Sequence, residues 1–265
     1  TKSKHVVTIS RGAFIYTRNS IGLFDANGIR ESKTLINGMK PIKLDGKNIR
    51  EIIGSISIKE GVKGFIIFYN DGTLNKYSIE DIRILNAWHG ITDEKTFIST
   101  ATPYYDEENT IACVSKDGNI KQIEVKDINK RAVSSGDVIK SCYCIDNNKN
   151  VIFVDNKGYY CNIAPSDIPL LGRSAGGVKT NFENLDNLYI VQIEEGHDTV
   201  VLCSTDTKDN QSYTCSIEPT DIEEVKRTNK YKKLPIPDSH IINGIDSISI
   251  IDKEALVVCI GIASS

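Results

Sequence analysis

The chain repeats one pattern several times: an apolar strand, a turn with a glycine, an alternating strand and then an Asp-Ile pair. The pattern is clearest in residues 65–82, where Asp71-Gly72 separates two runs rich in β-branched and aromatic residues. Asp-Gly between such runs is the strongest short-range signal of a β-hairpin, here with a two-residue type I′ turn. Because an internal repeat constrains a fold more than any single motif, we interpret the whole chain as an array of hairpins.

Further copies occupy residues 111–128, 151–168 and 200–222, and a looser copy begins at residues 6–9 with a turn expected at Arg11-Gly12. The aspartates of the four regular copies lie 46, 40 and 54 residues apart, at Asp81, Asp127, Asp167 and Asp221. This spacing is close to the period of a propeller blade. A short apolar segment follows each Asp-Ile pair and another strand precedes the next hairpin, which indicates about four strands per unit.

The predicted fold is therefore all-β, a β-propeller-like pinwheel of about five to six four-stranded blades, in a single domain that spans residues 1–265. Radial repetition explains how so many short strands avoid exposed edges. No amphipathic helix of about ten residues or more is readable, which disfavours helical and α/β folds. The repeats are expected at about 4–58, 62–105, 109–146, 149–194 and 198–251, with 254–265 closing the ring or truncated.

The formal net charge is −3 at neutral pH, so a nucleic-acid partner has to be argued from the local distribution of charge. The seven cysteines form no CxxC pair, and we expect them to be reduced core residues. The four histidines are far apart in the chain, the glycines around Gly176 do not make GxGxxG, and no catalytic triad is readable. We expect no metal, no cofactor and no catalytic residue.

No apolar run approaches the ~20 residues that cross a bilayer. The chain starts at Thr1 without a basic segment and an apolar leader. We therefore expect a cytoplasmic fragment of a longer protein, with no membrane partner.

A turn glycine, an alternating strand, a loop with arginine and glycine, and a Gly-hydrophobic pair recur in this order along the chain. This arrangement resembles the C-terminal β-pinwheel domain of the A subunits of bacterial DNA gyrase and topoisomerase IV. The best local match is residues 151–182, in which residues 173–179 are similar to the family's Arg-x-x-x-Gly-Val-Lys/Arg loop. The resemblance extends over nearly the whole chain.

The resemblance implies a non-catalytic domain of a type IIA DNA topoisomerase A subunit, whose outer rim binds, bends and wraps duplex DNA. Strand cleavage and the ATP-dependent activity would belong to other parts of the enzyme. The implied partners are duplex DNA, the catalytic core of the same A subunit and an ATPase B subunit, and the implied location is cytoplasmic and nucleoid-associated. Affinity would come from Lys and Arg placed against phosphates, with little base reading.

The candidate DNA-binding residues are cations in loops at equivalent points of successive repeats. They are Lys40, Lys43, Lys121, Arg131, Arg173, Lys179, Lys226, Arg227, Lys230, Lys232 and Lys233. The alternative for these loops is a solvated surface without a ligand. For residues 173–179, the alternative is a glycine-rich turn that only reverses the chain.

Two features depart from the family pattern. Members place a Lys-Arg pair just past the turn glycine, whereas this chain has Asn75-Lys76, Lys121-Gln122 and Cys161-Asn162 there. The seven-residue glutamine-arginine-glycine box of gyrase is not found. These departures favour a topoisomerase IV-like subunit, or a divergent phage or plasmid one, with reduced wrapping. The alternative function is a β-propeller that binds another protein and no nucleic acid.

Overall fold

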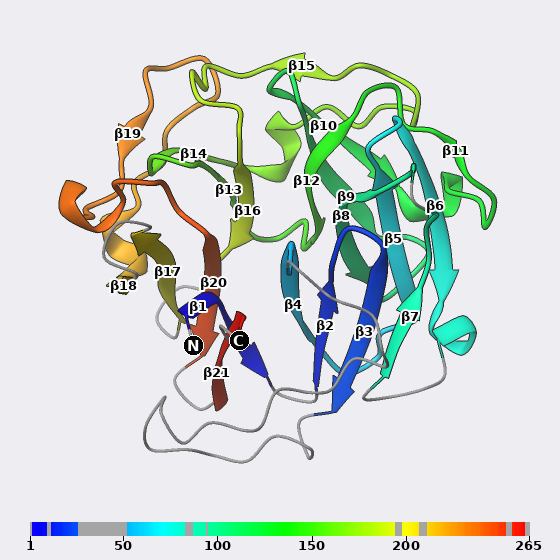
Figure 1. Cartoon of the computed structure of the whole chain (residues 1–265). Coiled ribbons are helices and arrows are strands. Elements are labelled where there is room, and N and C mark those ends of the chain that lie inside the picture. Colours follow the sequence, from blue (N-terminus) through cyan, green and yellow to red (C-terminus); the bar gives the residue numbers. More distant parts are fainter. Residues whose placement is uncertain are drawn as a thin grey trace.

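The computed structural model describes residues 2–9, 12–25, 52–82, 87–93, 95–193, 198–206, 211–252 and 256–262. These residues form short sheets around a common centre, with no α-helix among them (Figure 1). Within the same ranges, no helix is long and apolar enough to cross a membrane. The all-β, propeller-like pinwheel predicted from the repeats is confirmed.

Hairpins form where the repeated pattern predicts them: β5 (Gly64–Tyr69) with β6 (Thr73–Ser78), β9 (Thr110–Ser115) with β10 (Asn119–Glu124), β13 (Val151–Asp155) with β14 (Tyr159–Ile163), and β17 (Asp198–Asp206) with β18 (Gln211–Ile217). At the first three turns, Gly72, Gly118 and Gly158 have φ of 78°, 77° and 89°. Each glycine N–H donates to the carbonyl oxygen three residues earlier. The loops therefore end in a left-handed glycine and are one residue longer than the predicted type I′ turn.

Four of the described sheets have four strands, with the hairpin in the middle, one strand at the centre of the ring and a short strand at its periphery. From the centre outward they are β4 (Gly54–Ile58), β2 (Gly12–Tyr16), β3 (Ser20–Asp25) and β7 (Ala87–Gly90); β8 (Ile98–Tyr104), β5, β6 and β11 (Val133–Ser134); β12 (Ile139–Ile145), β9, β10 and β15 (Val178–Lys179); and β16 (Leu188–Gln192), β13, β14 and β19 (Lys232–Lys233). A fifth sheet has three described strands, β20 (Ser247–Asp252), β17 and β18.

The first and last strands close the ring. β1 (Lys2–Ile9) pairs antiparallel with β21 (Leu256–Ile262), so the strand expected at residues 6–9 forms but is not half of a hairpin that turns at Arg11-Gly12. The first hairpin is β2–β3 instead. The inner strands contact one another in the order β1, β4, β8, β12, β16, β20 and back to β1 (Figure 1).

The short outer strand of each four-stranded blade is donated by the following repeat. β7 comes after β6 in the chain but pairs with β3, and β11, β15 and β19 pair in the same way with β6, β10 and β14. The Asp-Ile pairs lie where the chain turns toward these edges, at the 3₁₀ turns η3 (Ile79–Ile82), η4 (Val125–Asp127), η5 (Pro165–Asp167) and η6 (Pro219–Asp221). The sequence pattern predicts each short strand to pair within its own repeat, which the structure corrects. The exchange covers the outer edge of the preceding hairpin, whose N–H and C=O groups would otherwise be unpaired.

The core lies between the blades, where side chains of neighbouring sheets pack face to face. One continuous cluster joins the blades of β9, β13 and β17. In another cluster, the rings of Phe14 and Phe65 stack with centroids 4.2 Å apart. Each blade buries its apolar side chains only against the two neighbouring blades. This packing sets the angle between adjacent blades and therefore the spacing of their outer edges.

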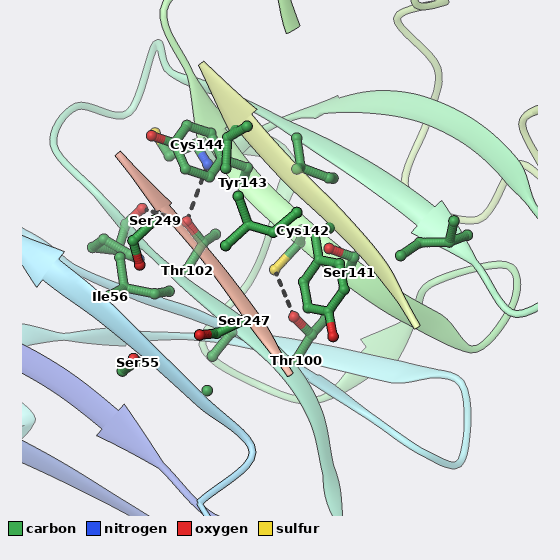
Figure 2. A pocket seen from close by; sticks show the side chains of 18 of the residues that line it. Ser55, Ile56, Thr100, Thr102, Ser141, Cys142, Tyr143, Cys144, Ser247 and Ser249 are labelled. Carbon is green, nitrogen blue, oxygen red and sulfur yellow. Dashed lines mark hydrogen bonds between the residues drawn. The ribbon is translucent and has the colours of Figure 1, made fainter. Parts of the chain in front are cut away.

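The inner strands line a central cavity of about 1120 Å³. Its wall is rich in hydroxyl groups, among them Ser55, Ser141, Ser247 and Ser249 (Figure 2). Thr102 Oγ1 accepts a hydrogen bond of 3.0 Å from a backbone N–H of β12, which links two adjacent inner strands. The described lining contains no histidine that could act as the base for a nucleophilic serine.

Candidate nucleic-acid interface

The outer edges of β6, β10 and β14 carry loops at equivalent positions. On each edge, Lys76, Gln122 or Asn162 donates its backbone N–H to the incoming chain at 3.1, 2.8 and 3.1 Å respectively. The chain then leaves the strand and returns as β11, β15 or β19. The residues between the last of these backbone contacts, at Asn129, Leu171 and Val225, and the returning strand are 130–132, 172–177 and 226–231. We call these segments the rim loops.

All charged residues of the rim loops are basic. They contain six Lys or Arg and no Asp or Glu, although the whole chain has 35 acidic and 32 basic residues. The six cations are Lys130, Arg131, Arg173, Lys226, Arg227 and Lys230. Five of them are among the candidates predicted from the sequence, and Lys130, the direct neighbour of Arg131, is not.

Four of these cations are available to a ligand. Lys130, Arg131, Lys226 and Lys230 are exposed, and none forms an ion pair within the part of the chain that the structure describes. They belong to two rim loops separated by the blade of β10. The surface therefore carries uncompensated positive charge at more than one point around the ring.

The two remaining arginines of the rim loops are half-buried. Arg227 Nη1 donates to the carbonyl oxygen of Lys179 at 2.7 Å, which ties the last rim loop to β15 of the neighbouring blade. The carbonyl oxygen of Arg227 accepts a bond of 2.8 Å from the Tyr231 hydroxyl, whose pKa is raised by burial. Arg173 has no carboxylate partner among the described residues.

The predicted lysines of the outer strands differ in their partners. Lys179 on β15 is exposed, whereas on β19 Lys232 pairs with Glu223 and Lys233 pairs with Asp238. The hydrogen bond from Lys232 lowers the pKa of the Glu223 carboxyl. The positive charge of β19 is thus partly neutralised by carboxylates of the same repeat.

The prediction that Lys121 binds DNA is wrong, because its side chain is not accessible to a ligand. Its side chain is buried with 2% exposure, and its ammonium donates to three backbone carbonyl oxygens. A buried ammonium whose three hydrogens are all bonded cannot reach a phosphate. Burial also lowers the pKa of Lys121. The other two predicted lysines of the set, Lys40 and Lys43, lie outside the described residues.

The positions that depart from the family's Lys-Arg pair hold the incoming chain. Gln122 Nε2 donates to the carbonyl oxygens of Pro165 and Ile168, and the equivalent Asn162 Nδ2 donates to that of Ile222 at 3.2 Å. These amides anchor the segment that leads from the Asp-Ile turn to the rim loop. In the sequence these positions are visible only as missing charge, because the strand exchange that buries them cannot be seen in a single repeat.

The described cysteines lie in strands, and Cys161 on β14 contacts Tyr231 of the last rim loop. Cys113, Cys142 and Cys161 are buried free thiols, and burial raises the pKa of Cys113 to about 12 and that of Cys161 to about 11. His240 Nδ1 lies 3.2 Å from Cys215 Sγ. No group of three or more His, Cys, Asp or Glu that could hold a metal occurs among the described residues.

Comparison with known proteins gives no match to any family model and none to a curated protein sequence. Two of the solved structures that are similar in fold show the extent of the match. The DNA gyrase A C-terminal domain has a TM-score of 0.65 at 17% identity, covering 91% of this chain and 82% of that domain. The C-terminal domain of DNA topoisomerase IV has a TM-score of 0.66 at 15% identity, covering 92% and 80%. The resemblance inferred from the repeats is confirmed at the level of the fold: this chain has the fold of the C-terminal domains of DNA gyrase A and DNA topoisomerase IV.

Proposed function

We propose that this domain binds and bends duplex DNA along its outer rim, as a non-catalytic part of a type IIA topoisomerase A subunit. The observation that carries the proposal is the composition of the rim loops, with six cations and no acidic residue in a chain that is acidic overall. The loops occupy equivalent places on successive blades. A curved row of such cations suits the regularly spaced phosphates of a duplex.

The chemistry of this rim favours backbone contacts over sequence reading. Lysine and arginine neutralise phosphates and release counterions, which supplies affinity without base recognition. Bending a 20–30 bp site by 40–90° costs of order 1–6 kcal/mol. Contacts from several blades are needed to offset this cost. Because Lys232 and Lys233 are paired with carboxylates, they contribute less to phosphate binding, and we expect the bend to be modest.

The remaining assignments follow from the proposed family. The catalytic core of the same A subunit and an ATPase B subunit are the proposed protein partners, with strand cleavage and ATP use outside this domain. The proposed location is the cytoplasm, in association with the nucleoid. The fold similarity to domains of gyrase A and topoisomerase IV supports these proposals.

Binding to a labelled duplex of ~40 bp across a salt series tests the proposal, because phosphate-dominated binding makes log K fall linearly with log salt. A rim variant with Arg131→Ala, Lys226→Ala and Lys230→Ala removes three exposed cations. Each lost phosphate contact lowers the steepness of the slope by about 0.9. We expect the rim variant to bind more weakly, with a slope shallower by about 2 to 3.

The matched control removes the same charge near the inner strands: Lys59→Ala, Lys95→Ala and Lys140→Ala, all at exposed positions. Its slope should stay close to that of the unchanged domain. Equal effects of the two triple variants, or no binding by the unchanged domain at low salt, would contradict the proposal. If the unchanged domain does not bind DNA, the exposed loops are better explained as a binding site for another protein.

A further inference from the structure

Lys121 lies beneath the middle rim loop and holds it from below. Its Nζ donates to the carbonyl oxygens of Ser135 at 2.7 Å, Arg173 at 2.6 Å and Ala175 at 2.7 Å. These three bonds use every hydrogen of the ammonium. Within the described chain Lys121 forms no ion pair, so its charge is compensated by backbone dipoles.

The acceptors belong to segments that come from two different blades. Arg173 and Ala175 are in the rim loop beside β10, whereas Ser135 follows β11 on the outer edge of the preceding blade. The two segments touch, because a Cβ on Gly136, which has a φ of +79°, would lie 2.4 Å from the carbonyl oxygen of Ser174. Lys121 therefore bonds both sides of the contact between two neighbouring parts of the rim.

The loop that Lys121 holds has one backbone hydrogen bond of its own, from the Ala175 N–H to the carbonyl oxygen of Gly172 at 3.0 Å. Residues 172–177 include three glycines, and a Cβ on Gly172 or Gly176 would meet nothing within 4 Å. At the equivalent position on β14, Cys161 carries no charge; its Sγ lies 3.2 Å from the carbonyl oxygen of Val225 and also bonds the Tyr231 hydroxyl. Glycine loses the most conformational freedom on ordering, so the two bonds from Lys121 add order to a glycine-rich loop that has a single internal turn bond.

We infer that Lys121 is a positioning residue: its ammonium fixes the backbone of residues 172–177 and thereby presents Arg173 at the rim. The consequence for DNA binding rests on the proposed function, while the fixing of the loop does not. A loop fixed before binding loses less entropy when it meets a ligand. Lys121 thus contributes to affinity without touching the duplex.

Lys121→Met tests this inference, because methionine keeps the apolar stem and removes the ammonium. Lys116→Met is the matched control, since it removes the same charge from an exposed position at the turn of the same hairpin. Hydrogen exchange of residues 171–177 should speed up in Lys121→Met and stay unchanged in Lys116→Met. Unchanged exchange in Lys121→Met would overturn the inference whether or not the domain binds DNA.

A double-mutant cycle on duplex binding separates positioning from a direct contact. Arg173→Ala should weaken binding at least about threefold in the unchanged domain, and should have almost no further effect in Lys121→Met. Full additivity of the two substitutions would contradict the inference. If the unchanged domain does not bind duplex at all, the proposed function fails, and the exchange experiment still decides the role of Lys121.

A measurement on the unsubstituted side chain covers the case in which Lys121→Met does not fold. Exposed lysine ammonium protons exchange with water too fast to observe near neutral pH, whereas a buried ammonium with three acceptors should give a lysine ¹⁵N–¹H signal. Among the described residues, Lys76 is a second candidate with 12% side-chain exposure, and a Lys76→Arg variant should retain the Lys121 signal. Absence of a protected ammonium signal in that variant would remove the first step of the inference.

Discussion

Lys232 on β19 forms an ion pair with Glu223, nine residues earlier in the chain, and both side chains are exposed at the outer edge of the ring. The pair places a carboxylate beside one of the cations proposed to bind phosphate. The pKa of Glu223 is lowered by this bond, so the carboxylate stays ionised at every pH at which the domain would meet DNA. A phosphate has to compete with Glu223 for Lys232.

Glu223→Gln should therefore raise the affinity for duplex DNA, by about two- to fivefold at low salt, which is the range expected for freeing one exposed cation. Glu224→Gln is the matched control, because Glu224 is exposed, adjacent and without an ion pair in the described chain. Titration of the labelled duplex with both variants measures the difference. Equal gains would mean that only net charge matters and that the ion pair does not restrain Lys232.

Gly136→Ala should destabilise the fold, because the position has a φ of +79° and the new Cβ would lie 2.4 Å from a backbone oxygen of the middle rim loop. The combined strain and overlap correspond to about 1–3 kcal/mol of unfolding free energy. Gly172→Ala in the rim loop itself should be nearly neutral, since nothing lies within 4 Å of its Cβ. Urea denaturation of the two variants checks the contrast, and similar losses would show that the contact at Gly136 is not as close as described.

The hairpins could be predicted from the sequence because each is encoded by neighbouring residues. Asp71-Gly72 lies between two runs that pair with each other, and the required left-handed glycine is visible in the sequence itself. The all-β class and the ring followed from repetition of that local signal. The hairpin is predicted correctly even though its loop is one residue longer than expected, because the flanking strands and the turn glycine are adjacent in the sequence.

Partners that come from another repeat could not be predicted in the same way. Val178 is an ordinary apolar residue in the sequence, and only the fold shows that it pairs with Ile120 of the preceding blade. For the same reason the sequence predicts Lys121 to be a surface cation, because the carbonyl groups that surround it lie 14, 52 and 54 residues away in the chain. Exposed cations of the rim loops such as Arg131, Lys226 and Lys230 could be predicted because an exposed charge in a loop needs no partner.

Gln122→Met should cost about 1–3 kcal/mol of stability, because the carbonyl oxygens of Pro165 and Ile168 lose their buried donor. Gln122→Glu should cost more, since it places a carboxylate against the same two oxygens at a position with 6% exposure. The denaturant midpoints of the two variants show which of them is less stable. A Glu variant as stable as the Met variant would show that water reaches this site and that the amide does not anchor the incoming chain.

In the folded protein, the buried thiols of Cys161 and Cys113 should react slowly with alkylating reagents. Burial raises the pKa of Cys161 to about 11 from its usual 9.0, which lowers the thiolate fraction at pH 8 by about a hundredfold. Cys113, with a pKa of about 12 and no exposure, should react more slowly still. Peptide mapping after iodoacetamide treatment of native and denatured protein gives the two rates, and native labelling of Cys161 as fast as in denaturant would contradict the burial of this strand.

The same pKa shifts make a prediction for stability. Because the folded chain holds these thiol protons to higher pH than the unfolded chain does, the unfolded state is the first to release them as the pH rises above about 9. The thiols therefore contribute stability that is fully present below pH 9 and is lost as the pH rises toward 11 and 12, the folded-state values of Cys161 and Cys113. Cys161→Ala should flatten this alkaline loss of the denaturant midpoint, whereas a midpoint whose pH dependence is unchanged by the substitution would assign the loss to other groups.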